Sequence, residues 1–259
     1  MKLPRFIPIL TTFTTRVSGR EMAELLQSPA ALARALADTQ TVVGHDGVLC
    51  LFAPGILATA CIGQRGDTQS LELKPSVDVL QTPPLTTLLE SIQPLQHFLP
   101  DSALIFTAIT GPGLLYSQLQ EALKSSGETS GVDPDHVVDV IRTVVRCALE
   151  LKVDGIALIE QTTPATPLDL MRCHKTVRKL ADFYDAAFLE FRLPAAEAQQ
   201  PELQAHCVFD LTSAENGLGP VKGIPGPATA SDVLPFTTAG DVPETTTVEV
   251  LKALLHEIT

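Results

Sequence analysis

The chain has 259 residues and a formal net charge of −12 at pH 7, and 45% of its residues are hydrophobic. A chain of this length can bury a large core, and because we find no linker-like stretch we expect one domain over residues 1–259. The acidic balance argues against a nucleic-acid or anionic-membrane surface, which would be basic. Any site that binds an anion must therefore be local.

The cysteines are scattered and form no Cys-x-x-Cys pair. An odd, dispersed set within apolar or helical patterns indicates reduced thiols rather than a disulfide framework. No apolar segment approaches the roughly 20 residues that span a bilayer. We therefore expect a cytoplasmic protein without membrane contact. The five cysteines are Cys50, Cys61, Cys147, Cys173 and Cys207.

The first predicted strand, Phe6 to Phe13, leads into a short loop with two arginines. Arg16 and Arg20 flank Val17-Ser18-Gly19. A guanidinium group grips a carboxylate or phosphate through paired hydrogen bonds, so the loop is a candidate receptor for an anionic small molecule. The alternative is that both arginines are solvated ends of a loop and a helix.

Helical periodicity is clear in several of the segments that follow. Apolar residues recur at helical spacing between Ser28 and Val43, and again between Pro134 and Leu151. Asp133 supplies an N-cap before a proline at the first helical position. Further helices are predicted at about Pro167 to Tyr184 and at Thr247 to Ile258.

Apolar runs that alternate with helices are typical of βα units around a parallel sheet, and eight such units close into a (β/α)8, or TIM-type, barrel. Only about ten residues separate the last three runs, whereas a crossover with a helix needs about 10–12. We therefore expect a barrel that is shortened or distorted in its C-terminal third, without helices between strands 6, 7 and 8. The predicted strands are Phe6 to Phe13, Gly47 to Phe52, Ala103 to Thr110, Gly155 to Gln161, Ala186 to Leu193, His206 to Leu211, Val221 to Ile224 and Val233 to Thr238.

Several motifs, in the correct order, resemble the uroporphyrinogen decarboxylase superfamily, which also contains zinc-dependent methyltransferases that serve methylcobalamin and coenzyme M. Arg16-Val17-Ser18-Gly19-Arg20 resembles the decarboxylase loop Arg-Gln-Ala-Gly-Arg, which cradles substrate carboxylates. Ala108 to Pro112 resembles a Gly-Pro turn after a family strand, and Val153 to Glu160 the Gly-Ala-Asp strand. Thr237 to Pro243 resembles the closing turn of the methyltransferase branch. The resemblance implies the barrel and a substrate-binding role for the two arginines.

The residues that carry chemistry in this superfamily are replaced here. In the methyltransferases zinc is held by a His-x-Cys at a strand end and a Cys in the closing turn, where this chain has Phe188-Leu189-Glu190-Phe191-Arg192 and Ala239-Gly240-Asp241. A thiolate zinc site needs those soft ligands, so we expect no metal and no cofactor. In the decarboxylases an aspartate meets the pyrrole nitrogens, but here Phe52 is followed by Ala53-Pro54. Uroporphyrinogen decarboxylation is therefore not expected.

Reactive residues of such barrels come from the carboxyl ends of strands. Glu160 ends the cleanest buried strand, where it would serve as a general acid or base, or would cap the next turn. Glu190 and Arg192 alternate to one face of their strand, so both enter the barrel or both point outwards to a helix. The predicted catalytic residues are Glu160, Glu190 and Asp241, and the predicted substrate-binding residues are Arg16, Arg20, Thr110, Arg192 and Thr238.

Other polar motifs are more simply structural. Gly111-Pro112-Gly113 would present backbone N–H groups to an anion, although a turn is the simpler account. Asp182 and Asp185 have a spacing that would suit Mg²⁺ and a diphosphate, or a solvated helix end. The histidines at helix ends or faces are expected to be solvated or capping: His45, His97, His136, His174 and His256.

Together these residues predict a lyase or transferase that acts on an anionic small molecule. The alternatives are a corrinoid-linked methyltransferase, a catalytically degenerate barrel that serves as a binding or partner subunit, and a magnesium-dependent enzyme with a diphosphate substrate. Apolar barrel surface left bare by the missing helices would favour a homodimer or a covering loop. No nucleic-acid partner is expected.

Overall fold

The computed structural model describes residues 11–50, 55–64, 71–127, 131–160 and 168–192, strands at 207–209 and 236–238, and positions 248, 249 and 252. The chain divides into two compact units. The first comprises Met1–Cys50, Glu90–Phe106 and Gln200–Thr259, and the second comprises Leu51–Leu89 and Thr107–Gln199. Each unit draws on segments that are far apart in the sequence.

The first unit is built around one long helix, α3, Pro29–Val43. Ser28 caps its start by accepting a hydrogen bond from the Ala31 N–H, and Gly44 ends it in the left-handed conformation at φ 81°. Helices α1 and α7 pack against α3. The other elements of this unit are α1 Thr11–Ser18, α2 Met22–Leu25, β1 Gly47–Cys50, α7 Ile92–Phe98, β7 Cys207–Phe209 and β8 Phe236–Thr238.

The second unit holds two parallel strands, β5 and β6, with α8, α9 and α10 packed around them. Asp133 caps α9, and its side chain accepts a hydrogen bond from the Asp135 N–H at 3.0 Å. Helix α6, Leu85–Glu90, and strand β4, Leu104–Thr110, each have residues in both units. The elements that lie wholly in the second unit are α4 Ile56–Cys61, β2 Ile62–Gln64, β3 Leu71–Leu73, α5 Ser76–Val79, α8 Pro112–Ser125, α9 Pro134–Glu150, β5 Gly155–Glu160, α10 Leu168–Phe183 and β6 Ala187–Arg192.

The described strands form one four-stranded sheet, in the order β1-β4-β5-β6, and two two-stranded sheets. Strand β5 pairs in parallel with β6, and β7 with β8, whereas β2 and β3 form an antiparallel hairpin. Every residue of β5 is buried, as expected for a parallel strand covered on both faces. The predicted α/β class with a mostly parallel sheet is confirmed, and no closed barrel is found among the described strands.

The prediction for the N-terminal strand is wrong where the structure can test it. Thr11–Ser18 form helix α1, so Arg16 lies in the last helical turn and not in a loop, while residues 6–10 lie outside the described part. Gly19 has φ 64°, and the Arg20 N–H donates to the Thr15 carbonyl at 3.2 Å. This is the six-to-one hydrogen bond of a Schellman C-cap. The glycine that we interpreted as part of a loop therefore ends a helix.

Most of the other predicted elements are confirmed. The predicted strands that begin at residues 47, 103, 155 and 186 contain β1, β4, β5 and β6. Those that begin at residues 206 and 233 contain the short strands β7 and β8. The run Val221 to Ile224 lies outside the described residues, and the C-terminal helix is seen at Val248, Glu249 and Lys252. The sequence analysis missed the β2–β3 hairpin. None of the helices in the described ranges is long and apolar enough to cross a membrane.

His45 is buried and not solvated as expected. Only 2% of its surface is exposed, and its Nδ1 atom has no hydrogen-bond partner among the residues that the structure describes. It lies between the C-cap of α3 and the start of β1. Burial lowers the pKa of His45 from 6.5 to about 3, because a charged imidazolium would be desolvated there.

We predict that His45 makes the chain less stable in acid. In the unfolded chain His45 takes a proton near pH 6.5, whereas the folded chain does so only near pH 3, so the free energy of unfolding falls as the pH drops through this window. His45→Gln should flatten the fall, as measured by urea unfolding across the window. The control is His97→Gln, which changes an exposed histidine on α7. An unchanged slope in His45→Gln would contradict the prediction.

Candidate functional site

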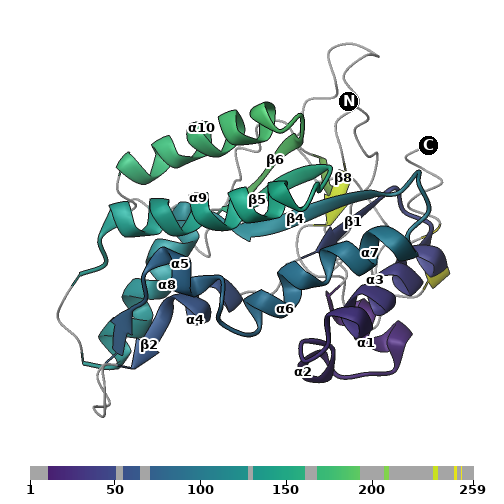
Figure 1. Ribbon diagram of the computed structural model, residues 1–259, viewed down its shortest axis with the longest axis horizontal. Coiled ribbons are helices and arrows are strands. Elements are labelled where there is room, and N and C mark those ends of the chain that lie inside the picture. The colour runs from purple at the N-terminus through teal and green to yellow at the C-terminus, as the bar shows by residue number, and fades with distance from the viewer. Residues whose placement is uncertain are drawn as a thin grey trace. The chain divides into compact units, whose positions relative to one another are not determined.

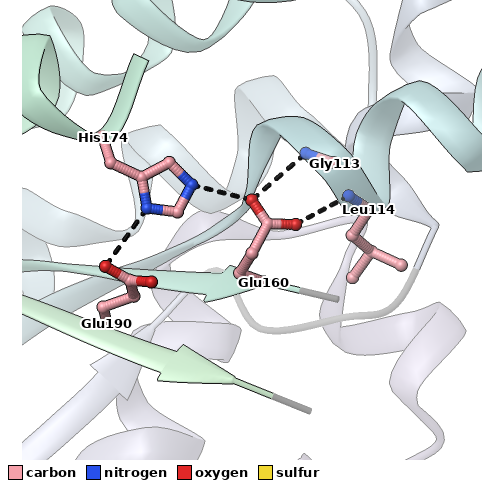
Figure 2. A network of polar contacts seen from close by, with 5 residues as sticks. All are labelled: Gly113, Leu114, Glu160, His174 and Glu190. Carbon is pink, nitrogen blue, oxygen red and sulfur yellow. Dashed lines mark hydrogen bonds and ion pairs between the residues drawn. The ribbon is translucent and has the colours of Figure 1, made fainter. Parts of the chain in front are cut away.

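Glu160, the last residue of β5, is completely buried and caps a neighbouring helix (Figure 2). Its Oε2 accepts a hydrogen bond from the Gly113 N–H at 3.1 Å, and its Oε1 accepts one from the Leu114 N–H at 2.9 Å. Both N–H groups belong to the first turn of α8, where they have no partner within the helix. A negative charge there is also favoured by the helix dipole. The anion that we considered for this turn is thus the chain's own carboxylate.

Gly111 allows the carboxylate to come this close. A Cβ atom at this position would lie 2.7 Å from Oε2 of Glu160 and 3.0 Å from the carbonyl oxygen of Ile159. The Gly111 N–H also donates to that carbonyl at 2.7 Å, which fixes the turn against the end of β5. A side chain at position 111 would therefore displace either the carboxylate or the turn.

His174, on α10, bridges Glu160 and Glu190. Its Nε2 lies 2.9 Å from Oε2 of Glu160, and its Nδ1 lies 3.1 Å from Oε2 of Glu190, as Figure 2 shows. Burial alone lowers the pKa of an imidazole, but the hydrogen bonds and charges of Glu160 and Glu190 outweigh it and raise the pKa of His174 to about 9. Near neutral pH the ring is therefore protonated, and each nitrogen donates to one carboxylate.

Both carboxylates lie on the face of the strands that α10 covers. In the β5–β6 pair Glu190 is opposite Leu158, two residues before Glu160, so alternation places both glutamates on one face. Phe188 shares this face, and the guanidinium of Arg178 lies 5.2 Å from the centre of its ring. The side chain of Glu190 points toward α10, where it meets His174. We refer to Glu160, His174 and Glu190 as the Glu-His-Glu network.

Of the predicted site residues, only Glu160 and Glu190 are seen to lie close together in the described part of the chain. Arg192 pairs with Glu160 along the backbone at the end of β6, and Thr238 ends β8 opposite Phe209. Asp241 lies outside the described residues. Thr110 borders a small cavity in the second unit whose other lining residues are apolar: Ile56, Leu57, Leu85, Ala108, Ile109 and Val144.

The two arginines lie in the first unit. The Arg16 guanidinium lies 4.8 Å from the centre of the Phe13 ring, and Arg20 is exposed at the end of α1. This stacking holds Arg16 on the surface of its own helix. Their role in binding an anion stays a prediction.

Sequence reasoning missed His174, although a signal was present. The buried residues of α10 are Leu170, Cys173, Val177 and Ala181, which recur at helical spacing. His174 lies four residues after the first of these and three before Val177, so it belongs to the same stripe. A histidine on the buried stripe of a helix that follows a strand-end glutamate was the available clue.

Burial holds two of the described cysteines in the protonated form. Burial raises the pKa of Cys61 to about 12 in spite of nearby Lys74. Burial and the charge of Glu160 raise the pKa of Cys173 to about 11, with Arg142 opposing. Protonated thiols are poor ligands for zinc. Within the described ranges no group of three or more His, Cys, Asp or Glu side chains is placed to hold a metal ion.

Comparison with known proteins identifies the fold but not the family. No protein-family model matches the chain, and no curated protein matches it. Among solved structures it is similar to a methyltransferase from Methanosarcina mazei, with a TM-score of 0.66 and 14% sequence identity. The match covers 100% of this chain and 94% of the methyltransferase chain. At this identity the likeness shows that the chains share a fold.

We predict that Glu160→Ala strongly destabilises the protein. The change leaves the Gly113 and Leu114 N–H groups and the His174 imidazolium without their acceptor, and losing one partner of a buried ion pair costs about 3–5 kcal/mol. Denaturant unfolding measures this loss. Glu150→Ala, at the exposed end of α9, is the control and should stay within about 0.5 kcal/mol of the unchanged protein. A loss of unfolding free energy that is small and equal in Glu160→Ala and Glu150→Ala would contradict the stabilising role of the buried network.

We also predict that the network weakens in alkali. Because the folded-state pKa of His174 is about 9 and its unfolded value 6.5, the extra stability is complete below pH 6.5 and is lost as the pH rises through 9. His174→Gln cannot titrate, so its free energy of unfolding should depend less on pH over this window. NMR titration of the His174 ring in the folded protein gives the pKa directly. A midpoint near 6.5 would contradict the doubly bonded imidazolium.

Proposed function

We propose that the chain is a (β/α)8-type enzyme that transfers a small group to or from an anionic small molecule, methyl being the favoured group. The observation that carries this proposal is the likeness to a methyltransferase over the full length of the chain. The sheet is mostly parallel, and enzymes with such sheets bind substrates at the carboxyl ends of the strands. Glu160 and Glu190 lie at or near those ends of β5 and β6.

Within this proposal the two glutamates have different tasks. Glu160 is completely buried and engaged with α8, so it positions the strand end and does not meet substrate. The side chain of Glu190 is 18% exposed and that of His174 is 11% exposed. Since His174 holds a proton between the carboxylates, Glu190 is our candidate for exchanging a proton with a bound substrate. Arg16 and Arg20 remain our proposed anion-binding residues.

A corrinoid-linked methyltransferase is the second candidate. It rests on the family resemblance in the sequence together with the likeness to a methyltransferase structure. The family resemblance implies a thiolate zinc site for that chemistry, and the described donors do not supply one. Glu190, which lies on the strand where the resemblance expects a His-x-Cys, is hydrogen-bonded to His174. We therefore propose that any methyl transfer by this chain proceeds without thiolate-bound zinc.

Methyl transfer by purified protein tests the proposal. Methylcobalamin is mixed with coenzyme M, an anionic thiol, and loss of the methyl–cobalt bond is followed by absorbance, while the zinc content of the same sample is measured. We expect turnover with far less than one zinc per chain. Arg16→Ala and Arg20→Ala should each raise KM by about tenfold, the worth of one charge-assisted contact. Arg34→Ala is the matched control, because Arg34 also lies over a phenylalanine ring, that of Phe98.

The outcomes separate the candidates. Stoichiometric zinc would overturn the proposal of zinc-free chemistry. Turnover with methylcobalamin but with no methyl donor that lacks a corrinoid would favour the corrinoid-linked enzyme. No turnover with any anionic acceptor, and no thermal stabilisation by one, would favour a degenerate barrel that acts as a binding subunit. Equal effects of Arg16→Ala and Arg34→Ala would remove the anion-binding role from Arg16.

A further inference from the structure

The outer face of α10 carries a concentration of basic side chains that is unusual for this acidic protein. Of the chain's 18 lysines and arginines, four lie between positions 172 and 179, while the net charge of the whole chain is −12. No acidic residue occurs between Leu170 and Ala181. The exposed basic residues are Arg172, Lys175, Arg178 and Lys179.

This arrangement does not serve the stability of the helix. Lys175 lies three residues after Arg172 and four before Lys179, and like charges at these spacings destabilise a helix by about 0.2–0.5 kcal/mol per pair. Basic residues stabilise a helix in its last turn, and the last turn of α10 has none. Lys175 and Lys179 also make no ion pair with any residue that the structure describes.

Two other exposed helices of this chain pair their charges. On α3 the Arg34 guanidinium lies 3.0 Å from Asp38, and on α9 Arg142 lies 3.6 Å from Asp139. Mixed charge of this kind is typical of a helix face that only meets solvent. Between Leu170 and Ala181 the charged side chains of α10 are all basic, and Asp182 is the first acidic residue after them. This run is a local departure from the paired charges of α3 and α9.

The basic stripe ends at an exposed aromatic pair. The Phe183 side chain is 81% exposed and Tyr184 is 36% exposed, and their rings pack edge to face at 5.3 Å. Phe183 lies four residues after Lys179, on the same helical face. Aromatic side chains and arginine are enriched in protein–protein interfaces, where they act as anchors. Figure 1 shows α10 lying beside α9 in the second unit, and the two helices pack together.

We propose that Arg172, Lys175, Lys179 and Phe183 form a docking surface for a partner protein that presents an acidic segment with an apolar side chain. Charge complementarity selects the acidic segment, and the bare Phe183 ring selects the apolar side chain. The stripe spans about 16 Å, the rise of eleven residues, and suits a short peptide segment. Duplex DNA and an anionic membrane present no apolar side chain to Phe183, and as extended, stiff surfaces they also meet the repulsion of the rest of a chain with net charge −12. A flexible acidic peptide needs to touch only the stripe.

Binding of two labelled polymers tests the surface. The full chain is titrated into poly-glutamate and into a random glutamate–tyrosine copolymer, and fluorescence anisotropy is followed at low and high salt. We expect both polymers to bind, the copolymer more tightly, with affinity that falls as salt screens the charges. Phe183→Ser should weaken the copolymer only.

The charge-reversal variant Lys175→Glu with Lys179→Glu should weaken both polymers by at least about tenfold, because attraction becomes repulsion. Its thermal midpoint should be no lower than that of the unchanged protein, since like-charge repulsion within α10 is relieved. Lys124→Glu with Lys252→Glu changes the net charge equally at exposed positions elsewhere and is the control.

Three results would overturn the proposal. The first is that neither polymer binds, and the second is that the control variant loses as much affinity for the polymers as the α10 variant does. The third is that duplex DNA or phosphatidylserine vesicles bind more tightly than the copolymer. The last result would assign the stripe to a nucleic acid or a membrane.

Discussion

The described part of the second unit depends on one buried negative charge, the carboxylate of Glu160. A carboxylate that is completely removed from water must be fully satisfied, and here three donors meet it: the Gly113 and Leu114 N–H groups and the His174 ring. These donors come from α8 and α10. A single charge therefore fixes two helices against the end of β5. A substitution that displaces or removes the Glu160 carboxylate disturbs all three elements.

The same charge explains the state of His174 and, through it, of Glu190. Because the ring donates to both glutamates, α10 is held to β6 as well as to β5. The network thus ties the carboxyl-terminal parts of two parallel strands to the helices beside them. The proposed division of labour, with Glu160 as support and Glu190 as the proton-exchanging group, follows from their different burial.

Periodicity and capping residues predicted much of the fold, because these signals are local. Asp133 and Pro134 mark the start of α9, Ser28 marks that of α3, and the buried run at Gly155 is β5. Helix α1 was missed because a threonine-rich segment after an apolar run is typical of a strand, and Gly19 was assigned to a loop rather than to a C-cap. The β2–β3 hairpin was missed because its strands are three residues each and only half-buried or exposed.

The site could be predicted in part. Strand-end position selected Glu160 and Glu190, but alternation alone could not tell which face α10 covers, because helix placement is a tertiary property. The partner of both glutamates, His174, was predictable only from its place on the buried stripe of α10. That Glu160 caps α8 depends on how close Gly111 lets the turn come, which no local pattern encodes.

The coupling between Glu160 and His174 in a double-mutant cycle tests this account most directly. Glu160→Gln, His174→Gln and the double variant are compared by the free energy of unfolding. A charge-assisted, buried hydrogen bond predicts that the two effects are strongly non-additive, with a coupling of about 1.5–3 kcal/mol. Additive effects, within about 0.5 kcal/mol, would mean that the two side chains do not depend on each other and would contradict the central role of the buried carboxylate.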